Sequence, residues 1–235
     1  MALARFGFLL TALLLTSLSM PAAYADSLET ALVKAAPDAN AKVISLAVRA
    51  SQCRLAQGAE PVQRLAVIDY SLPSTEQRLW VFDLKKRKLL FHELVAHGRN
   101  SGENMANQFS NQNESNASSL GLYRTQSSYL GHNGYSLRME GLEPGFNDNA
   151  FDRDIVIHGA PYVSPKLARV NGRIGRSLGC PAVRPAIAHR LIDSMKDGQL
   201  LFSYYPDRRW LKSSAFINCG GTAMANAAKP KKTIN

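Results

Sequence analysis

One cysteine of the chain stands where a thiol could act as a nucleophile. Cys180 lies in the short loop Ser177-Leu178-Gly179-Cys180-Pro181, just before a segment with a helical pattern. Free backbone N–H groups in such a loop can lower the pKa of a thiol and can bind an oxyanion. The loop therefore indicates nucleophilic catalysis by a cysteine.

A cysteine nucleophile also needs a base, and histidine is the usual one. Two of the five histidines, His97 and His158, end an apolar strand pattern and precede a glycine. Side chains at such strand ends can converge on one site, and the spacing favours neither residue. We expect His92, His132 and His189, in a strand, a glycine-rich turn and a helix, to be ordinary core or surface residues.

A metal centre is a weaker interpretation of the same residue types. The sequence contains no Cys-x2-Cys and no His-Glu-x-x-His spacing, which are common patterns of zinc ligands. We therefore expect no metal and no cofactor.

The first 25 residues have the layout of a cleavable secretory signal. A single charge at Arg5 precedes an apolar run over 6–15, and the small-x-small triplet 23–25 comes before Asp26. No later segment approaches about 18 consecutive apolar residues, so we expect no transmembrane anchor after cleavage. The protein is thus expected to be exported to the periplasm or the cell wall.

The chain is basic, with 28 Lys and Arg against 18 Asp and Glu and a formal net charge of +10. A basic exported protein does not normally meet chromosomal DNA, so we expect no nucleic-acid partner. Cell-wall polymer, lipopolysaccharide, anionic lipid and a merely solvated basic surface all stay open as explanations of the charge.

The hydrophobic patterns predict a mainly β fold. Helical patterns cover 27–58, with Asp38 as a candidate N-cap, and 185–196, which begins with a proline. Strand patterns cover 65–70, 79–84, 89–96, 121–124, 135–139, 154–158 and 200–205, and an Asn-rich loop covers 99–118. Many short strands with few helices indicate a β-sandwich with an N-terminal helical segment and one helix after the catalytic loop.

These patterns divide the chain into four segments. They are a signal peptide at 1–25, an N-terminal helical segment at 26–61, a catalytic domain at 62–206 and a flexible basic tail at 207–235.

Two motifs resemble those of the murein L,D-transpeptidase catalytic domain family. They are Ile-Val-Ile-His-Gly at 155–159 and Ser-Leu-Gly-Cys at 177–180, whose cysteine follows the histidine by 22 residues. The similarity extends over roughly 62–206 and includes the segments 95–98, 101–102, 118–121 and 141–147. The resemblance implies an L,D-transpeptidase-like β-sandwich in which Cys180 is the acylated nucleophile and His158 its acid–base partner.

The resemblance also implies roles for neighbouring groups. The backbone N–H groups of Gly179 and Cys180 would hold an oxyanion, the carbonyl of Gly159 would orient the imidazole of His158, and Ser177 would shape the loop. No cofactor or metal takes part in the implied reaction.

Two positions depart from the commoner family motif. Leu178 replaces a second histidine, and Ala182 replaces an arginine or asparagine two residues after the cysteine. Arg184 is a candidate to replace that group by binding a substrate carboxylate, and a surface charge is the equal alternative. Arg176 and His97 are weaker candidates for substrate contact.

The implied function is that of an exported cysteine L,D-transpeptidase and carbapenem target. Its donor and acceptor would be peptidoglycan tetrapeptide stems, with an acyl-enzyme on Cys180 and transfer to an amine that forms a 3,3 cross-link. The alternatives are an L,D-carboxypeptidase or amidase that hydrolyses the same stems, and a non-catalytic peptidoglycan-binding module.

The number of cysteines fits this implied role. Exported proteins tend to pair their thiols, and three cysteines leave one over. If Cys180 stays reduced as the nucleophile, Cys53 and Cys219 are the pair left to form a disulfide.

Overall fold

The computed structural model describes residues 21–219, with side chains from residue 28 onward. Its helices are α1 (Pro21–Ala35), α2 (Ala41–Ala56), α3 (Pro165–Asn171), α4 (Pro185–Met195) and α5 (Arg208–Ser213). Its strands are β1 (Arg64–Asp69), β2 (Leu79–Asp83), β3 (Lys88–Glu93), β4 (Gly121–Gly131), β5 (Gly134–Gly141), β6 (Val156–Gly159), β7 (Ala182–Val183) and β8 (Leu200–Tyr204). The expected signal segment lies outside this range except for 21–25, where α1 begins.

The strands form one sheet in the order β3-β2-β1-β8-β4-β5-β6-β7, which confirms the mainly β prediction. The two edges of this sheet meet, because the Ala96 N–H just after β3 donates to the Ala182 carbonyl of β7 at 2.8 Å. The sheet is therefore continuous and barrel-like, instead of two separate layers. This closure brings the segment after β3 next to the loop that carries Cys180.

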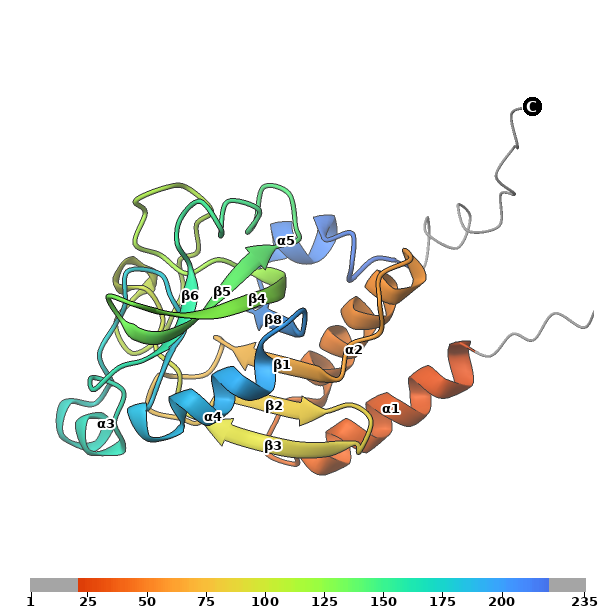
Figure 1. Cartoon of the computed structure of the whole chain (residues 1–235), viewed down its shortest axis with the longest axis horizontal. Helices are drawn as coiled ribbons and strands as arrows, with labels where there is room; N and C mark the ends of the chain where they lie inside the picture. The colour runs from red at the N-terminus through yellow and green to blue at the C-terminus, as the bar shows by residue number, and fades with distance from the viewer. Residues whose placement is uncertain (1–20, 220–235) are drawn as a thin grey trace, which may run out of the picture.

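The central strand β1 is buried on both faces. Leu65 and Val67 belong to a core shared with α1 and α2, whereas Ala66 and Ile68 belong to a second core with α4. In Figure 1, α1 and α2 run side by side and α4 crosses in front of β1. Successive side chains of a strand point to opposite faces, so burial on both sides explains the unbroken apolar run of this strand.

The N-terminal helical segment differs in detail from the prediction. It forms two helices, and α2 is capped by Asn40, whose side chain accepts a hydrogen bond from the Lys42 N–H at 3.0 Å. The expected cap, Asp38, lies in the turn between them. Both residue types suit the cap position, and packing of α2 on β1 selects the register.

The end of the described chain is ordered, contrary to the flexible tail expected from residue 207. Trp210 of α5 is fully buried, and its indole N–H donates to a carboxylate oxygen of Glu143 at 2.9 Å. Cys219 forms a disulfide with Cys53 of α2, across a sequence separation of 166 residues. The part of the expected tail beyond Cys219 lies outside the described residues.

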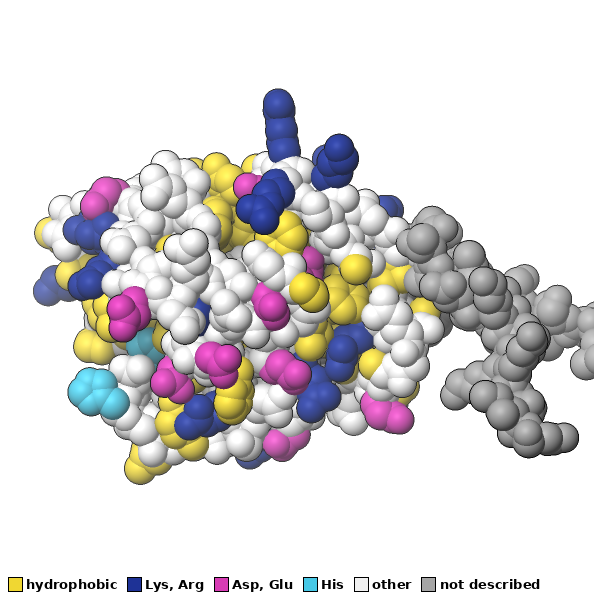
Figure 2. All heavy atoms as spheres, turned by 90° about the horizontal axis from the view of Figure 1, so that it is seen from above, with side chains coloured by type: hydrophobic (Ala, Val, Ile, Leu, Met, Phe, Trp, Pro, Cys, Tyr) yellow, Lys and Arg dark blue, Asp and Glu magenta, His cyan; other side chains and the backbone are white. Residues whose placement is uncertain are grey.

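The charge of the surface is mixed on the face that Figure 2 shows. Lys and Arg side chains are interspersed there with Asp and Glu, and they do not gather into one basic strip. Within residues 21–219, no helix combines the length and the apolar character that crossing a bilayer requires.

Candidate active site

Cys180 is the free thiol of the chain, because the other two cysteines are bridged. Its side chain is buried, with 9% of the residue exposed. The Val156 N–H of β6 donates to Sγ at 3.5 Å, and the thiol donates to the Asp154 carbonyl at 3.7 Å. The nucleophile candidate is therefore held against the strand that carries His158.

The pairing between β6 and β7 brings His158 near the loop that carries Cys180. The Cα of His158 pairs with that of Ala182, two residues after Cys180. Nδ1 of His158 lies 3.1 Å from the carbonyl oxygen of Gly159, which can only accept, so Nδ1 carries the proton. Nε2 is then the unprotonated nitrogen, as a base requires.

Burial shifts both groups toward their neutral forms. It raises the pKa of the Cys180 thiol, against the opposing effects of the Val156 N–H and the Arg153 charge. It lowers the pKa of His158, against the opposing effect of the Gly159 carbonyl. Both groups are thus neutral at rest, so attack by the sulfur requires that the thiol proton be taken up by a base such as His158.

The loop 177–181, the catalytic loop from here on, is held by Ser177. Its hydroxyl donates to the Cys180 carbonyl at 2.6 Å and accepts from the Gly179 N–H at 3.1 Å. The Gly179 N–H therefore already has a partner in this structure, and its expected part in an oxyanion hole stays a prediction. The Cys180 N–H lies against its own thiol and lowers the pKa of that thiol, so it is the loop donor next to the reacting atom.

Gly179 cannot be replaced by a larger residue without strain. Its φ is +126°, and a Cβ there would lie 2.9 Å from Ile155 Cδ1 and 3.0 Å from the Ala117 carbonyl oxygen. The positive φ and the close approach of the segments around 117 and 155 therefore favour glycine at this position.

His97 supports the catalytic loop from behind, and the structure corrects its expected role in substrate contact. The residue is 0% exposed, Arg78 Nη2 lies 2.7 Å from its Nδ1, and its Nε2 lies 3.3 Å from the Gly102 carbonyl oxygen. Both ring nitrogens are thus engaged inside the protein. The His97 carbonyl accepts from the Ser177 N–H at 2.9 Å, which fixes the start of the catalytic loop.

Acid should destabilise the protein through His97. Burial, and then the neighbouring Arg78 charge, lower its pKa to about 4, whereas an unfolded histidine titrates near 6.5. Between these two values the unfolded chain binds a proton that the folded chain does not, so stability falls as the pH falls, by about 3 kcal/mol in all. Urea unfolding of wild type and His97→Gln from pH 7 to pH 4 measures this difference. A variant with the same pH slope as wild type would contradict the assignment.

The two candidate arginines are bound to protein carboxylates. Arg176 Nη1 lies 2.7 Å from Glu103 Oε1 and donates to the Arg99 and Gly102 carbonyls at 3.1 Å each. Arg184 contacts both oxygens of Glu93, at 2.8 and 2.6 Å. None of these hydrogen bonds and ion pairs involves Cys180. The expected binding of a substrate carboxylate by Arg176 or Arg184 stays a prediction.

Arg153 is a site residue that the sequence analysis missed. Its Nη1 donates to the Ser110 carbonyl at 2.8 Å and to Ser119 Oγ at 2.6 Å. Its Nη2 donates to Ser115 Oγ at 3.0 Å and to the Ala117 carbonyl at 2.7 Å. A single guanidinium group therefore holds the second half of the Asn-rich loop in place.

The Arg153 clamp, meaning its four hydrogen bonds to residues 110–119, also lies close to the catalytic loop. Nη2 of Arg153 lies 3.5 Å from the position that a Cβ of Gly179 would occupy, and the Arg153 charge lowers the pKa of Cys180. Ser118 of the clamped loop donates to the Gly179 carbonyl at 3.1 Å. Nothing in the sequence around Arg153 distinguishes it from the other arginines, because its partners are between 34 and 43 residues away.

Replacing Arg153 with methionine should raise the pKa of the Cys180 thiol, because a nearby positive charge favours the thiolate. The pH dependence of alkylation by iodoacetamide measures this shift, and Arg153→Lys should recover part of it. Arg64→Met, which breaks an ion pair with Asp83, is the matched control. An unchanged alkylation profile in Arg153→Met would show that the clamp has no electrostatic effect on the thiol.

Within residues 21–219, no group of three or more His, Cys, Asp or Glu side chains is arranged to hold a metal ion.

Solved structures of L,D-transpeptidases are similar to parts of this chain. An L,D-transpeptidase in complex with imipenem is 14% identical with a TM-score of 0.38, and the match covers 61% of this chain and 60% of that one. An L,D-transpeptidase from Mycobacterium smegmatis is 12% identical with a TM-score of 0.39, and the match covers 62% of this chain and 60% of that one. An L,D-transpeptidase from Stackebrandtia nassauensis is 15% identical with a TM-score of 0.37, and the match covers 79% of this chain and 92% of that one. The chain thus spans 60% of the length of the first two structures.

No curated protein matches the chain. The sequence model of the L,D-transpeptidase catalytic domain matches residues 35–204, which is most of the chain and includes both His158 and Cys180. The chain belongs to the L,D-transpeptidase catalytic domain family.

Proposed function

We propose that this protein is an exported cysteine L,D-transpeptidase that cross-links peptidoglycan tetrapeptide stems. The family membership supports an enzyme of peptidoglycan. The observation that carries the proposal is a free, buried thiol held against β6, the strand that also carries a histidine whose Nδ1 is fixed by the Gly159 carbonyl. Export rests on the signal pattern of the first 25 residues and on the disulfide, which suits an oxidising compartment.

In the first half-reaction, the Cys180 sulfur attacks the carbonyl of the third stem residue, a diamino acid. The thiol proton passes to Nε2 of His158, and the N–H of Cys180 stabilises the oxyanion. The tetrahedral intermediate expels D-Ala, whose nitrogen takes the proton from His158. A thioester on Cys180 is left.

In the second half-reaction, an amine of another stem attacks the thioester. His158 Nε2 takes a proton from this amine, and the departing sulfur of Cys180 takes it back as the new amide forms. Water in place of the amine would give a tripeptide instead of a cross-link. The burial of Cys180 supports the amine as acceptor, since a dry site slows hydrolysis of the thioester.

Product analysis tests this function directly. Purified tetrapeptide stems are incubated with the protein, and the products are separated by mass. Dimers together with released D-Ala are the expected products. Tripeptides alone would identify a carboxypeptidase, and unchanged stems beside a folded, reduced protein would indicate a binding module.

A further inference from the structure

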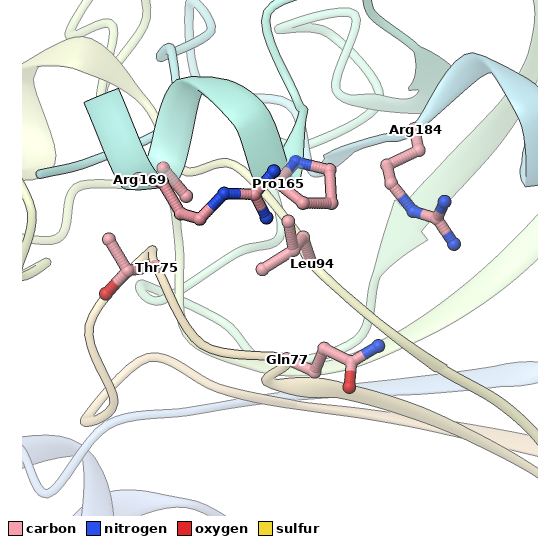
Figure 3. A pocket seen from close by; sticks show the side chains of 7 residues that line it. Thr75, Gln77, Leu94, Pro165, Arg169 and Arg184 are labelled. Atoms are coloured by element: carbon pink, nitrogen blue, oxygen red, sulfur yellow. The ribbon is translucent and has the colours of Figure 1, made fainter. Parts of the chain in front are cut away.

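A cavity of about 440 Å³ opens next to the segment that carries the site. It is lined by Thr75, Gln77, Leu94, Pro165, Ala168, Arg169 and Arg184. Figure 3 shows Pro165 and Arg169 of α3 along one wall, with Thr75 and Gln77 opposite and Leu94 between them. Three segments that are far apart in the sequence therefore form one concave surface.

The two arginines of this cavity differ in whether a protein carboxylate neutralises them. Arg184 is neutralised by its two contacts with Glu93, whereas the ion pairs among the described residues do not include Arg169. In Figure 3 the Arg169 guanidinium extends over the cavity. The nearby Arg173, by contrast, has a carboxylate partner in Glu103 at 3.1 Å.

The floor of the cavity is apolar. Leu94 and Ala168 are 4% and 8% exposed, and the Pro165 ring lies beside them. An exposed guanidinium group above an apolar floor suits a ligand that combines a carboxylate with an aliphatic chain. Peptides that contain free carboxylates have this combination.

The chain between Cys180 and Arg184 limits how far this wall of the cavity lies from the nucleophile. Arg184 follows Cys180 by four residues, so the Cα atoms of the two residues are at most about 14 Å apart. Tyr162, three residues before α3, lies within electrostatic reach of the thiol: burial, and then the Cys180 charge, raise its pKa to about 12. A stem of four residues spans about 13–14 Å when extended, so one peptide can reach from the thiol to the cavity.

We propose that this cavity binds a free carboxylate of the acceptor stem through Arg169. This inference rests on the proposed transpeptidase function. The carboxylate of the departing D-Ala lies one residue beyond the scissile carbonyl, about 4 Å away, and cannot reach the cavity. The acceptor presents an amine at the end of a long side chain, so its backbone carboxylates lie further from the thiol.

The test separates the acceptor from the donor by filling the donor site first. Wild type, Arg169→Gln and Arg169→Glu are acylated with a carbapenem, and the tetrapeptide stem is then titrated into each acyl-enzyme by calorimetry. We expect the Kd for the stem to rise about tenfold in Arg169→Gln and further in Arg169→Glu, with acylation rates within twofold of wild type. Lys166→Gln, which removes a charge from the same helix outside the cavity, should bind like wild type.

Equal affinity in wild type and both Arg169 variants would overturn the proposal, as would a wild-type acyl-enzyme that binds no stem. A parallel loss of acylation in the variants would place Arg169 at the donor step and would also overturn it. A wild-type protein that forms no acyl adduct would contradict the proposed function itself. The titration would then be made on the unmodified protein, where Arg169 dependence is still measurable.

Discussion

His158→Ala is expected to lower the rate of Cys180 acylation by a carbapenem by about 10²- to 10⁴-fold, the usual contribution of a positioned general base. The reason is the raised pKa of the buried thiol, which leaves little thiolate without a base to take the proton. The rate of appearance of the adduct by intact mass measures the loss. His132→Ala, at an exposed turn, is the control.

The pH profile gives this prediction a second readout. Because burial lowers the pKa of His158, its imidazole stays neutral to a pH below about 6.5, and wild-type acylation should decline only below that value. His158→Ala should lose this acid limb. A variant that acylates at the wild-type rate with the wild-type profile would mean that another group takes the proton.

The double change Cys53→Ser with Cys219→Ser is expected to lower the free energy of unfolding by about 4 kcal/mol. The disulfide closes a loop of 166 residues that contains the whole sheet, and long loops gain most from closure in the chain-entropy model. Urea unfolding with and without dithiothreitol measures the effect. The double variant is preferred because a single change would leave a second thiol able to react with Cys180.

The same experiment separates stability from catalysis. Dithiothreitol should destabilise wild type and Cys180→Ser alike, and it should leave the double variant unchanged. Acylation of the folded protein should not need the disulfide, since Cys180 is the free thiol. A wild-type protein whose unfolding midpoint does not respond to the reductant would contradict the structural role of this bridge.

Local signals in the sequence predicted the elements whose ends are determined by nearby residues. The helix expected at 185–196 is α4, because Pro185 suits its first position and Ile187 and Leu191 form a buried stripe. The hairpin of β2 and β3 was also predicted from local residues, because two apolar runs flank a short basic turn. The Ser164 cap and Pro165 signal α3 as clearly, although the sequence analysis did not use them.

Long-range contacts determined what the sequence analysis could not predict. The strand-end pattern is the same at His97 and His158, and only the closure of the sheet at Ala96 and Ala182 places the first behind the catalytic loop. Trp210 orders α5 through a carboxylate 67 residues away, where composition alone indicated flexibility. Arg153 was missed because its partners are brought to it by the fold.

Covalent labelling by a carbapenem tests whether Cys180 is an activated nucleophile. The reduced, folded protein and its Cys180→Ser variant are each incubated with a carbapenem, and their intact masses are compared. We expect one covalent adduct on the wild type and none on the variant. The absence of an adduct on both proteins, or an adduct on the variant, would contradict this role of Cys180.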